Sequence, residues 1–165
     1  MITRIAKTLL LAGVALFYTL VVFNNLTDFN SNYLFVRHVL SMETTFPGNH
    51  GLWRAMLSPA WHLAFYIGII AWEFATTILL WWGFAVLLRA VRQGVEEFNT
   101  AKRLPVMALT LSLLMWLVAF LAVGGEWFLM WQSHDWNGQE AAFRNFVVVG
   151  LVLLITVQPE TDQQP

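Results

Sequence analysis

Four long stretches of apolar residues, separated by shorter polar segments, dominate the pattern along this chain. They cover approximately residues 5–23, 61–88, 104–131 and 141–157. A bilayer core about 30 Å thick is crossed by roughly 20 helical residues, so each stretch is predicted to be a transmembrane helix. The fourth is the shortest and completes a crossing only if Arg144 and Asn145 lie at one membrane interface. The sequence therefore predicts a single-domain, all-α membrane protein built as a four-transmembrane-helix bundle.

The connections between these stretches differ in character. The longest, residues 24–60, contains a segment at 33–40 that is too apolar for a free loop and too short to cross. A helix lying in the interface or packed over the bundle is expected there. Proline is favoured in the first turn of a helix, so Ser58-Pro59 is predicted to open the second span. Residues 93–102 are predicted to form a short polar link, and the polar tail of residues 158–165 is expected to lack fixed structure from Pro159 onward.

Basic residues near the span ends are divided unequally between the two sides of the membrane. If all four stretches cross, one side receives Arg4, Lys7, Arg89, Arg92, Lys102 and Arg103, and the other receives Arg37, Arg54 and Arg144. Lys and Arg are retained preferentially on the cytoplasmic side, so both termini are predicted to be cytoplasmic and the long first loop to face outward. Tryptophans then gather near the outer boundary, with Trp81 and Trp82 expected near the inner one.

Composition removes several classes of function. Hydrophobic residues make up 58% of the 165 positions and charged residues only 12%. The net charge is -1 and no run of like charge is present, so a nucleic-acid partner is not expected. The chain has no cysteine, which excludes disulfides, thiolate metal sites and thiol nucleophiles.

Glu73 is the sharpest candidate for chemistry, because it interrupts a nearly apolar span and is expected close to the bilayer midplane. A charge at such a depth costs several kcal/mol. At helical spacing, His62, Tyr66, Thr76 and Thr77 share its face, so the second span carries a polar stripe directed at a neighbouring helix. Two interpretations stay open: a proton or ion relay, or a protonated carboxyl group that locks the bundle through a hydrogen bond.

A second polar group is expected at the outer ends of the first, third and fourth spans. Its members are Asn24, Asn25, Asp28, Glu126, Arg144 and Asn145. An ion pair between Arg144 and Asp28 or Glu126 would stabilise both charges at the partly dehydrated membrane interface. The group is interpreted as a clasp that fixes helix ends or, alternatively, as the lining of a pocket for a ligand or partner. Gly124-Gly125 before Glu126 permits a kink or a close helix approach.

No cofactor is expected. A haem held by two histidines needs ligands on facing helices at one depth, whereas only His62 begins a span and the other histidines lie in outer segments. No zinc site is expected either. Aromatic residues such as Trp72 and Trp116 are interpreted as packing or interface residues rather than as a quinone site.

Several strings on the expected outer face, taken together, resemble a known family. They are Asn24-Asn25-Leu26-Thr27-Asp28, the run from Asn32 to Phe46, Gly125-Glu126-Trp127-Phe128, Met130-Trp131-Gln132-Ser133, Trp136-Asn137-Gly138-Gln139 and Ala142-Phe143-Arg144. The chain resembles, over nearly its whole length, the bacterial predicted small integral membrane proteins of the domain of unknown function 2165. It has Glu43 where the family string has aspartate, a departure that keeps the charge. The resemblance implies a four-span inner-membrane protein of Gram-negative bacteria, and it brings no reaction, substrate or assigned site.

Three functions follow from these observations. The first is a non-catalytic accessory or interaction subunit, which docks onto a larger membrane assembly or a second copy through its helices and its periplasmic face. The second is a small proton- or cation-linked channel or carrier subunit that uses Glu73. The third is a membrane enzyme in which Asp28, Glu126 or Asp135 act with His134, although their spacing shows no catalytic constellation. The accessory subunit is the preferred hypothesis.

Overall fold

The computed structural model describes residues 1–161, and over this range every regular element is helical. The elements are α1 (Ile2–Thr27), α2 (Phe29–Ser41), η1 (Leu52–Arg54), α3 (Pro59–Ala90), α4 (Val95–Ala101), α5 (Arg103–Leu114), η2 (Met115–Trp127), η3 (Met130–Gln132) and α6 (Gln139–Val157). Pro59 occupies the first turn of α3, as its sequence predicts.

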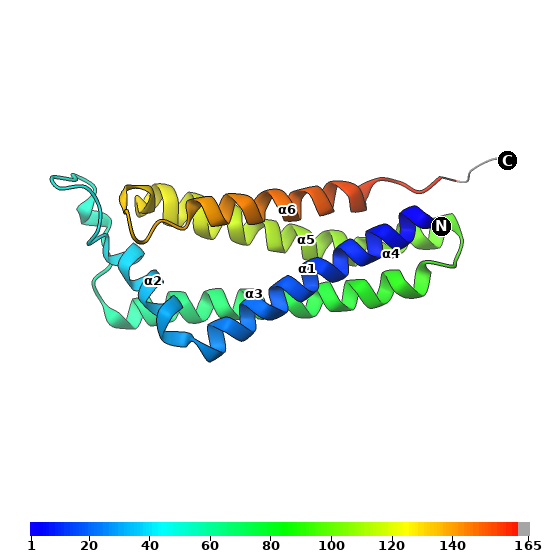
Figure 1. Cartoon of the computed structure of the whole chain (residues 1–165), viewed down its shortest axis with the longest axis horizontal. Helices are drawn as coiled ribbons and strands as arrows, with labels where there is room; N and C mark the ends of the chain where they lie inside the picture. The colour runs from blue at the N-terminus through cyan, green and yellow to red at the C-terminus, as the bar shows by residue number, and fades with distance from the viewer. Residues whose placement is uncertain (162–165) are drawn as a thin grey trace.

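The long helices run side by side along an elongated bundle, and α1 crosses α3 obliquely (Figure 1). The two ends of the described chain lie at the same end of this bundle, which we call the terminal end. The opposite end carries α2 and the connection of residues 42–58, and we call it the loop end.

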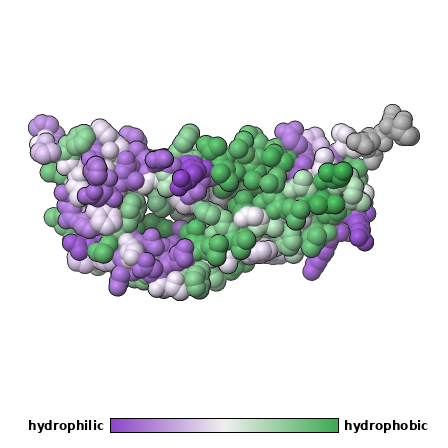
Figure 2. All heavy atoms as spheres, in the orientation of Figure 1, coloured by the Kyte–Doolittle hydropathy of each residue, from purple (hydrophilic) through white to green (hydrophobic). Residues whose placement is uncertain are grey.

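Four helical runs in the described residues are long and apolar enough to cross a membrane. They are α1, α3, the continuous run Val95–Trp127 and α6, whose most apolar windows have mean hydropathies of 1.8 to 2.5. Large apolar side chains such as Leu9, Phe74 and Leu151 are more than half exposed on their surface, which suits contact with lipid. Hydrophilic residues gather at both ends of the bundle and hydrophobic residues between them (Figure 2). The prediction of an all-helical protein with four helices able to span a membrane is confirmed.

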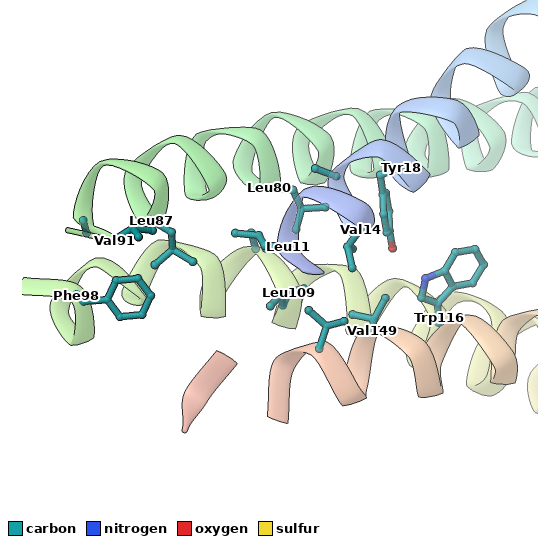
Figure 3. Packing of buried hydrophobic residues seen from close by; sticks show 14 of the residues in the cluster. Leu11, Val14, Tyr18, Leu80, Leu87, Val91, Phe98, Leu109, Trp116 and Val149 are labelled. Atoms are coloured by element: carbon teal, nitrogen blue, oxygen red, sulfur yellow. The ribbon is translucent and has the colours of Figure 1, made fainter. Parts of the chain in front are cut away.

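The main core lies between α1, α3, α5 and α6 (Figure 3). Leu11, Leu80, Leu87 and Leu109 are fully buried there, and Val14 and Val149 pack beside them. Gly83 lets α3 approach α5 closely, because a side chain at this position would meet the Pro105 ring and backbone at 3.2–3.3 Å.

The helix expected at residues 33–40 is present as α2, and it packs over the bundle. Val36, Val39 and Leu40 are buried in a second cluster that also holds Tyr66 and Ile70 of α3. The predicted polar link at 93–102 is instead largely helical, because Phe98 of α4 is fully buried against the main core.

The third span differs from the continuous helix predicted to reach residue 131. Beyond α5 the chain widens into the π-helical segment η2, whose last turn has the Phe128 N–H donating to the Val123 carbonyl five residues earlier, at 3.0 Å. The helix ends at Trp127, and Leu129 adopts a left-handed backbone with φ 54°, which a right-handed helix cannot continue.

The segment after α6 is held in place as far as it is described. Lys7 Nζ donates to the Gln158 carbonyl and to Glu160 Oε1, each at 2.6 Å. Asn99 of α4 exchanges two hydrogen bonds of 3.0 Å with the Glu160 backbone. The expectation of a tail without fixed structure is wrong for Glu160, because ionic and amide partners surround it. The rest of that expectation, residues 162–165, lies outside the described residues.

Candidate functional site

Glu73 and Asn25 form the centre of the candidate site. Asn25 Nδ2 donates a 2.6 Å hydrogen bond to Glu73 Oε2, although the sequence placed these residues in two separate groups. The Tyr66 hydroxyl lies 3.1 Å from the Asn25 carbonyl oxygen and 3.3 Å from Asn25 Oδ1, and it donates to this pair of oxygens. All three side chains are at least 94% buried, so α1 and α3 are joined by a buried polar cluster.

The polar stripe expected on α3 does face inward, since His62, Tyr66, Glu73 and Thr76 are all buried. It does not form one chain of hydrogen bonds. His62 Nε2 donates to the Met56 carbonyl at 2.6 Å, and the Thr77 hydroxyl donates to the Glu73 backbone carbonyl at 2.7 Å. The stripe therefore joins α3 to α1 through Glu73 and Tyr66, and to the preceding segment through His62, while the Thr77 bond stays within α3.

Glu73 stands at the middle of α3, and its position near the bilayer midplane stays a prediction. Glu73 precedes Arg89, near the terminal end of α3, by sixteen residues. This separation is about 24 Å along the helix axis. Its partner Asn25 stands two residues before the end of α1. Helix α3 has 32 residues, or about 48 Å, and is therefore longer than a bilayer core is thick.

A cavity of about 350 Å³ opens beside this cluster, and we call it the Glu73 cavity. It lies between α1, α2, α3, η2 and α6. Its polar lining consists of Asn24, Asn25, Asn32, Tyr66, Glu73, Trp116 and Asn145. The Trp116 indole is buried, and its Nε1 has no hydrogen-bond partner within residues 1–161. The cavity thus offers one carboxyl group and several amides.

The clasp expected at the outer helix ends is not formed by Arg144. Its side chain is exposed and makes no ion pair in the described part of the chain. Asp28 instead accepts a hydrogen bond from Ser31 at 2.9 Å. Glu126 is exposed, and only its backbone carbonyl is approached, by Arg54 at 3.5 Å. Helix α6 presents Arg144 to the surface, while Asn24, Asn25 and Asn145 line the cavity. The alternative interpretation, a pocket lining, matches these three asparagines.

The family model for a predicted small integral membrane protein, the domain of unknown function 2165, matches residues 3–159. The chain belongs to this family. The match covers all four spans and every residue of the Glu73 cavity. Neither a curated protein nor a solved structure matches the chain. Membership establishes an integral membrane protein of unknown function.

This family member also has an apolar groove of about 500 Å³ between α3 and η2, the α3/η2 groove. Small residues line it on both helices, namely Ala64 and Gly68 on α3 and Ala119 and Gly124 on η2. Trp61, Phe65 and Trp72 flank them. Four residues, Phe35, Val36, Ile69 and Phe120, line both this groove and the Glu73 cavity. The groove and the cavity are therefore divided by a single layer of side chains.

A second apolar groove, of about 670 Å³, lies between α1 and α6, and we call it the α1/α6 groove. Leu9, Leu10, Gly13 and Phe17 line it from α1. Residues Arg144 and Asn145 line its part nearest the start of α6. Asn145 also lines the Glu73 cavity, so this one side chain borders both spaces.

Two further polar residues of the family member escaped the sequence analysis. Ser112 Oγ donates to the Tyr18 hydroxyl at 2.8 Å, and that hydroxyl donates to the Ser112 carbonyl at 3.1 Å. Tyr18 stands seven residues before Asn25, a spacing that places both on one helix face and could have revealed it. Buried Leu11, Leu80 and Leu109 lie on the terminal-end side of this pair (Figure 3). Lys7 stands one helical turn before Leu11 on α1.

Among the described residues, no group of three His, Asp or Glu side chains lies close enough together to bind a metal ion.

His134 lies at the loop end on the exposed connection between η3 and α6. The pKa of His134 is raised, mainly by its hydrogen bond to Asp135 at 2.8 Å and to a smaller extent by the negative charge of Asp135. Asp28 and Glu126 are not among its partners, so the residues considered for an enzyme are not gathered around it.

Proposed function

We propose that this protein is a non-catalytic accessory protein of the bacterial inner membrane, and that it docks onto a larger membrane assembly through its helices and loop end. The terminal end is taken as cytoplasmic and the loop end as periplasmic, because six of the nine basic residues belong to the terminal end. The partner is a transmembrane helix with an apolar face. No reaction is assigned to the protein.

The α3/η2 groove carries this proposal. Helices associate in membranes largely through close packing, and small residues let their backbones approach. Ala64 and Gly68 stand four residues apart on α3, and both are exposed. A side chain added at Gly68 would meet no atom within 4 Å. A helix entering here would pack its own side chains over this strip, while the flanking tryptophans would enlarge the contact.

The shared wall adds a route from partner binding to the candidate site. Phe35, Val36, Ile69 and Phe120 each border both the α3/η2 groove and the Glu73 cavity. Protein interiors are close-packed, so a helix that moves these side chains also changes the shape of the cavity. Docking and the occupancy of the cavity are therefore expected to influence each other.

Extraction in mild detergent followed by native mass measurement tests the proposal. The wild-type chain, of 18.9 kDa, should be recovered with a heavier membrane partner. Gly68→Leu should release the partner because it fills the α3/η2 groove. Gly13→Leu places the same side chain on the α1/α6 groove, where it also has open space, and should retain the partner. A wild-type monomer at every concentration, or partner retention by Gly68→Leu, would refute the proposal. Masses in multiples of 18.9 kDa would identify a second copy as the occupant.

A proton- or cation-linked channel or carrier subunit is the second candidate. It is favoured by the burial of Glu73 with an amide partner and, among residues 1–161, no ion pair. The leucine layer between Tyr18 and Lys7 interrupts a polar route within one copy, so such a route would run between copies. Under this candidate, Glu73→Gln abolishes flux in proteoliposomes and leaves the unfolding temperature unchanged. Equal flux in the variant and the wild type removes the candidate.

A further inference from the structure

We propose that the loop end holds one aminophospholipid, with its primary ammonium group in the Glu73 cavity, its phosphate at Arg144 and an acyl chain in the α1/α6 groove. The site lies on the opposite side of the cavity wall from the α3/η2 groove. It does not depend on the accessory role proposed above.

The ammonium end rests on the chemistry of the Glu73 cavity. Its lining contains a carboxyl group but no Lys, Arg or His side chain among the described residues. A buried carboxylate without an opposite charge is costly, and an ammonium group supplies that charge. Asn24 and Asn32 line the same cavity, and their side-chain oxygens can accept hydrogen bonds from its remaining N–H groups.

This lining favours a primary ammonium group over a trimethylammonium group. Carboxylate and amide oxygens accept hydrogen bonds, which only the N–H groups of a primary ammonium can donate. A trimethylammonium group presents only methyl groups to these oxygens. The lining therefore selects a headgroup that ends in a primary ammonium group.

Arg144 provides the phosphate contact. It follows the first turn of α6 and is adjacent in sequence to Asn145, which borders the cavity as well as the groove. Its guanidinium group is exposed and free of any ion pair over residues 1–161. Guanidinium groups bind phosphate through two parallel hydrogen bonds, and a long arginine side chain reaches the headgroup layer from a helix end.

The acyl chain is assigned to the α1/α6 groove because of its volume and direction. The groove continues from Arg144 to Val152 on α6, eight residues or about 12 Å towards the terminal end. Gly13 leaves open space on the α1 side, and Leu10 and Val148 are exposed beside it. An acyl chain that leaves a headgroup at Arg144 runs in this direction, parallel to the spans.

Native mass measurement of the full chain with lipids of identical acyl chains tests the inference. The lipids are phosphatidylethanolamine, phosphatidylcholine and phosphatidylglycerol, which differ in carrying a primary ammonium, a trimethylammonium or no ammonium group. Wild-type protein should retain phosphatidylethanolamine at least tenfold better than either of the others. Glu73→Gln, which keeps an oxygen acceptor for Asn25, should abolish this preference. Arg144→Gln should weaken retention of all three lipids, and Arg37→Gln, an exposed loop-end arginine outside both spaces, should behave as the wild type.

Several outcomes would overturn the inference. Equal retention of phosphatidylethanolamine and phosphatidylcholine by the wild type would remove the ammonium site, and an unchanged preference in Glu73→Gln would do the same. Displacement of the lipid by free ethanolamine at equal concentration would remove the role of the groove. Dimers that carry no lipid would assign the groove to a second copy. Arg144 is exposed, so its variant tests the phosphate contact even if the Glu73 variant fails to fold.

Discussion

The side-chain amide of Asn25 donates a hydrogen bond of 2.6 Å to the carboxyl group of Glu73, and so joins the loop end of α1 to the middle of α3. Both residues are almost completely buried. Their contact turns a carboxyl group surrounded by apolar helices into part of a cluster with Tyr66. The stability of the bundle and the character of the Glu73 cavity therefore depend on the same pair.

Asn25→Ala should destabilise the protein, because Glu73 loses its donor and Tyr66 loses one of two acceptor oxygens. Leaving a buried polar group without a partner costs about 1–3 kcal/mol. Unfolding in a mild detergent, followed by circular dichroism against a denaturant, measures the change in free energy. The neighbouring exposed residue gives the control, since Asn24→Ala removes the same amide but no hydrogen bond in the described structure. Equal stability of the two variants would contradict the assigned contact.

Gly83→Leu should disrupt the contact between α3 and α5. A Cβ atom at this position would stand 3.3 Å from the Pro105 backbone, which cannot rotate away. Overpacking of this kind costs about 1–3 kcal/mol or more, seen as a lower unfolding temperature. Gly13→Leu is the matched change, because nothing lies within 4 Å of its added Cβ. If Gly13→Leu lowered the unfolding temperature and Gly83→Leu did not, the close approach of α3 and α5 at Gly83 would be contradicted.

The terminal end should loosen in acid through Glu160. Burial acts to raise the pKa of Glu160, but hydrogen bonds from Lys7 and Thr3 and the charges of Lys7 and Arg4 outweigh it, so the pKa lies below the usual 4.5. A carboxyl group with a lowered pKa contributes stability that is complete above 4.5 and is lost as the pH falls through the folded-state pKa. The side-chain amide signals of Asn99 should therefore shift in this acid range.

Glu160→Gln removes that titration while keeping a side chain of the same size. Its Asn99 signals should show no transition below pH 4.5, and Glu96→Gln, at an exposed position, should retain the wild-type transition. Identical acid titrations in the wild type and Glu160→Gln would mean that another group controls the contact.

Reporter fusions should place both termini on the cytoplasmic side. The bonds from Lys7 and Thr3 to Glu160 put the two ends of the described chain together, and the larger share of basic residues belongs to that end. A reporter active only in the cytoplasm should work at either terminus and fail when inserted after Gly48 in the loop-end turn. Activity at Gly48 and silence at the termini would reverse the orientation.

The spans could be predicted from the sequence because length and hydropathy alone determine whether a helix can cross a bilayer. Local features needed tertiary information. Residues 93–102 read as a polar link, yet one buried side chain, Phe98, is enough to hold α4 against the core. The end of the third span was misplaced by four residues because Trp127 to Trp131 stay apolar while the backbone turns at Leu129. The hydrogen bond from the Trp81 indole to Thr19 of α1 likewise depends on how two helices pack.

The candidate site was only half visible in the sequence. Burial of Glu73, Tyr66 and Thr76 follows from helical spacing on a single element, and this part was predicted. The partnership of Glu73 with Asn25 depends on where α1 crosses α3, which no local pattern encodes. Arg144 was matched to acids by charge, whereas α6 places it at the α1/α6 groove, where it makes no ion pair within residues 1–161.

The length of α3 has a mechanical consequence. With 32 residues in one unbroken helix, α3 is a rigid rod about 48 Å long. A bilayer core about 30 Å thick accommodates roughly two thirds of this length. The loop-end part of α3 packs against α2 through Val36, Val39 and Leu40. A force applied to α2 would therefore tilt or rotate α3 as a rigid body, and the displacement would reach the lipid around its apolar surface.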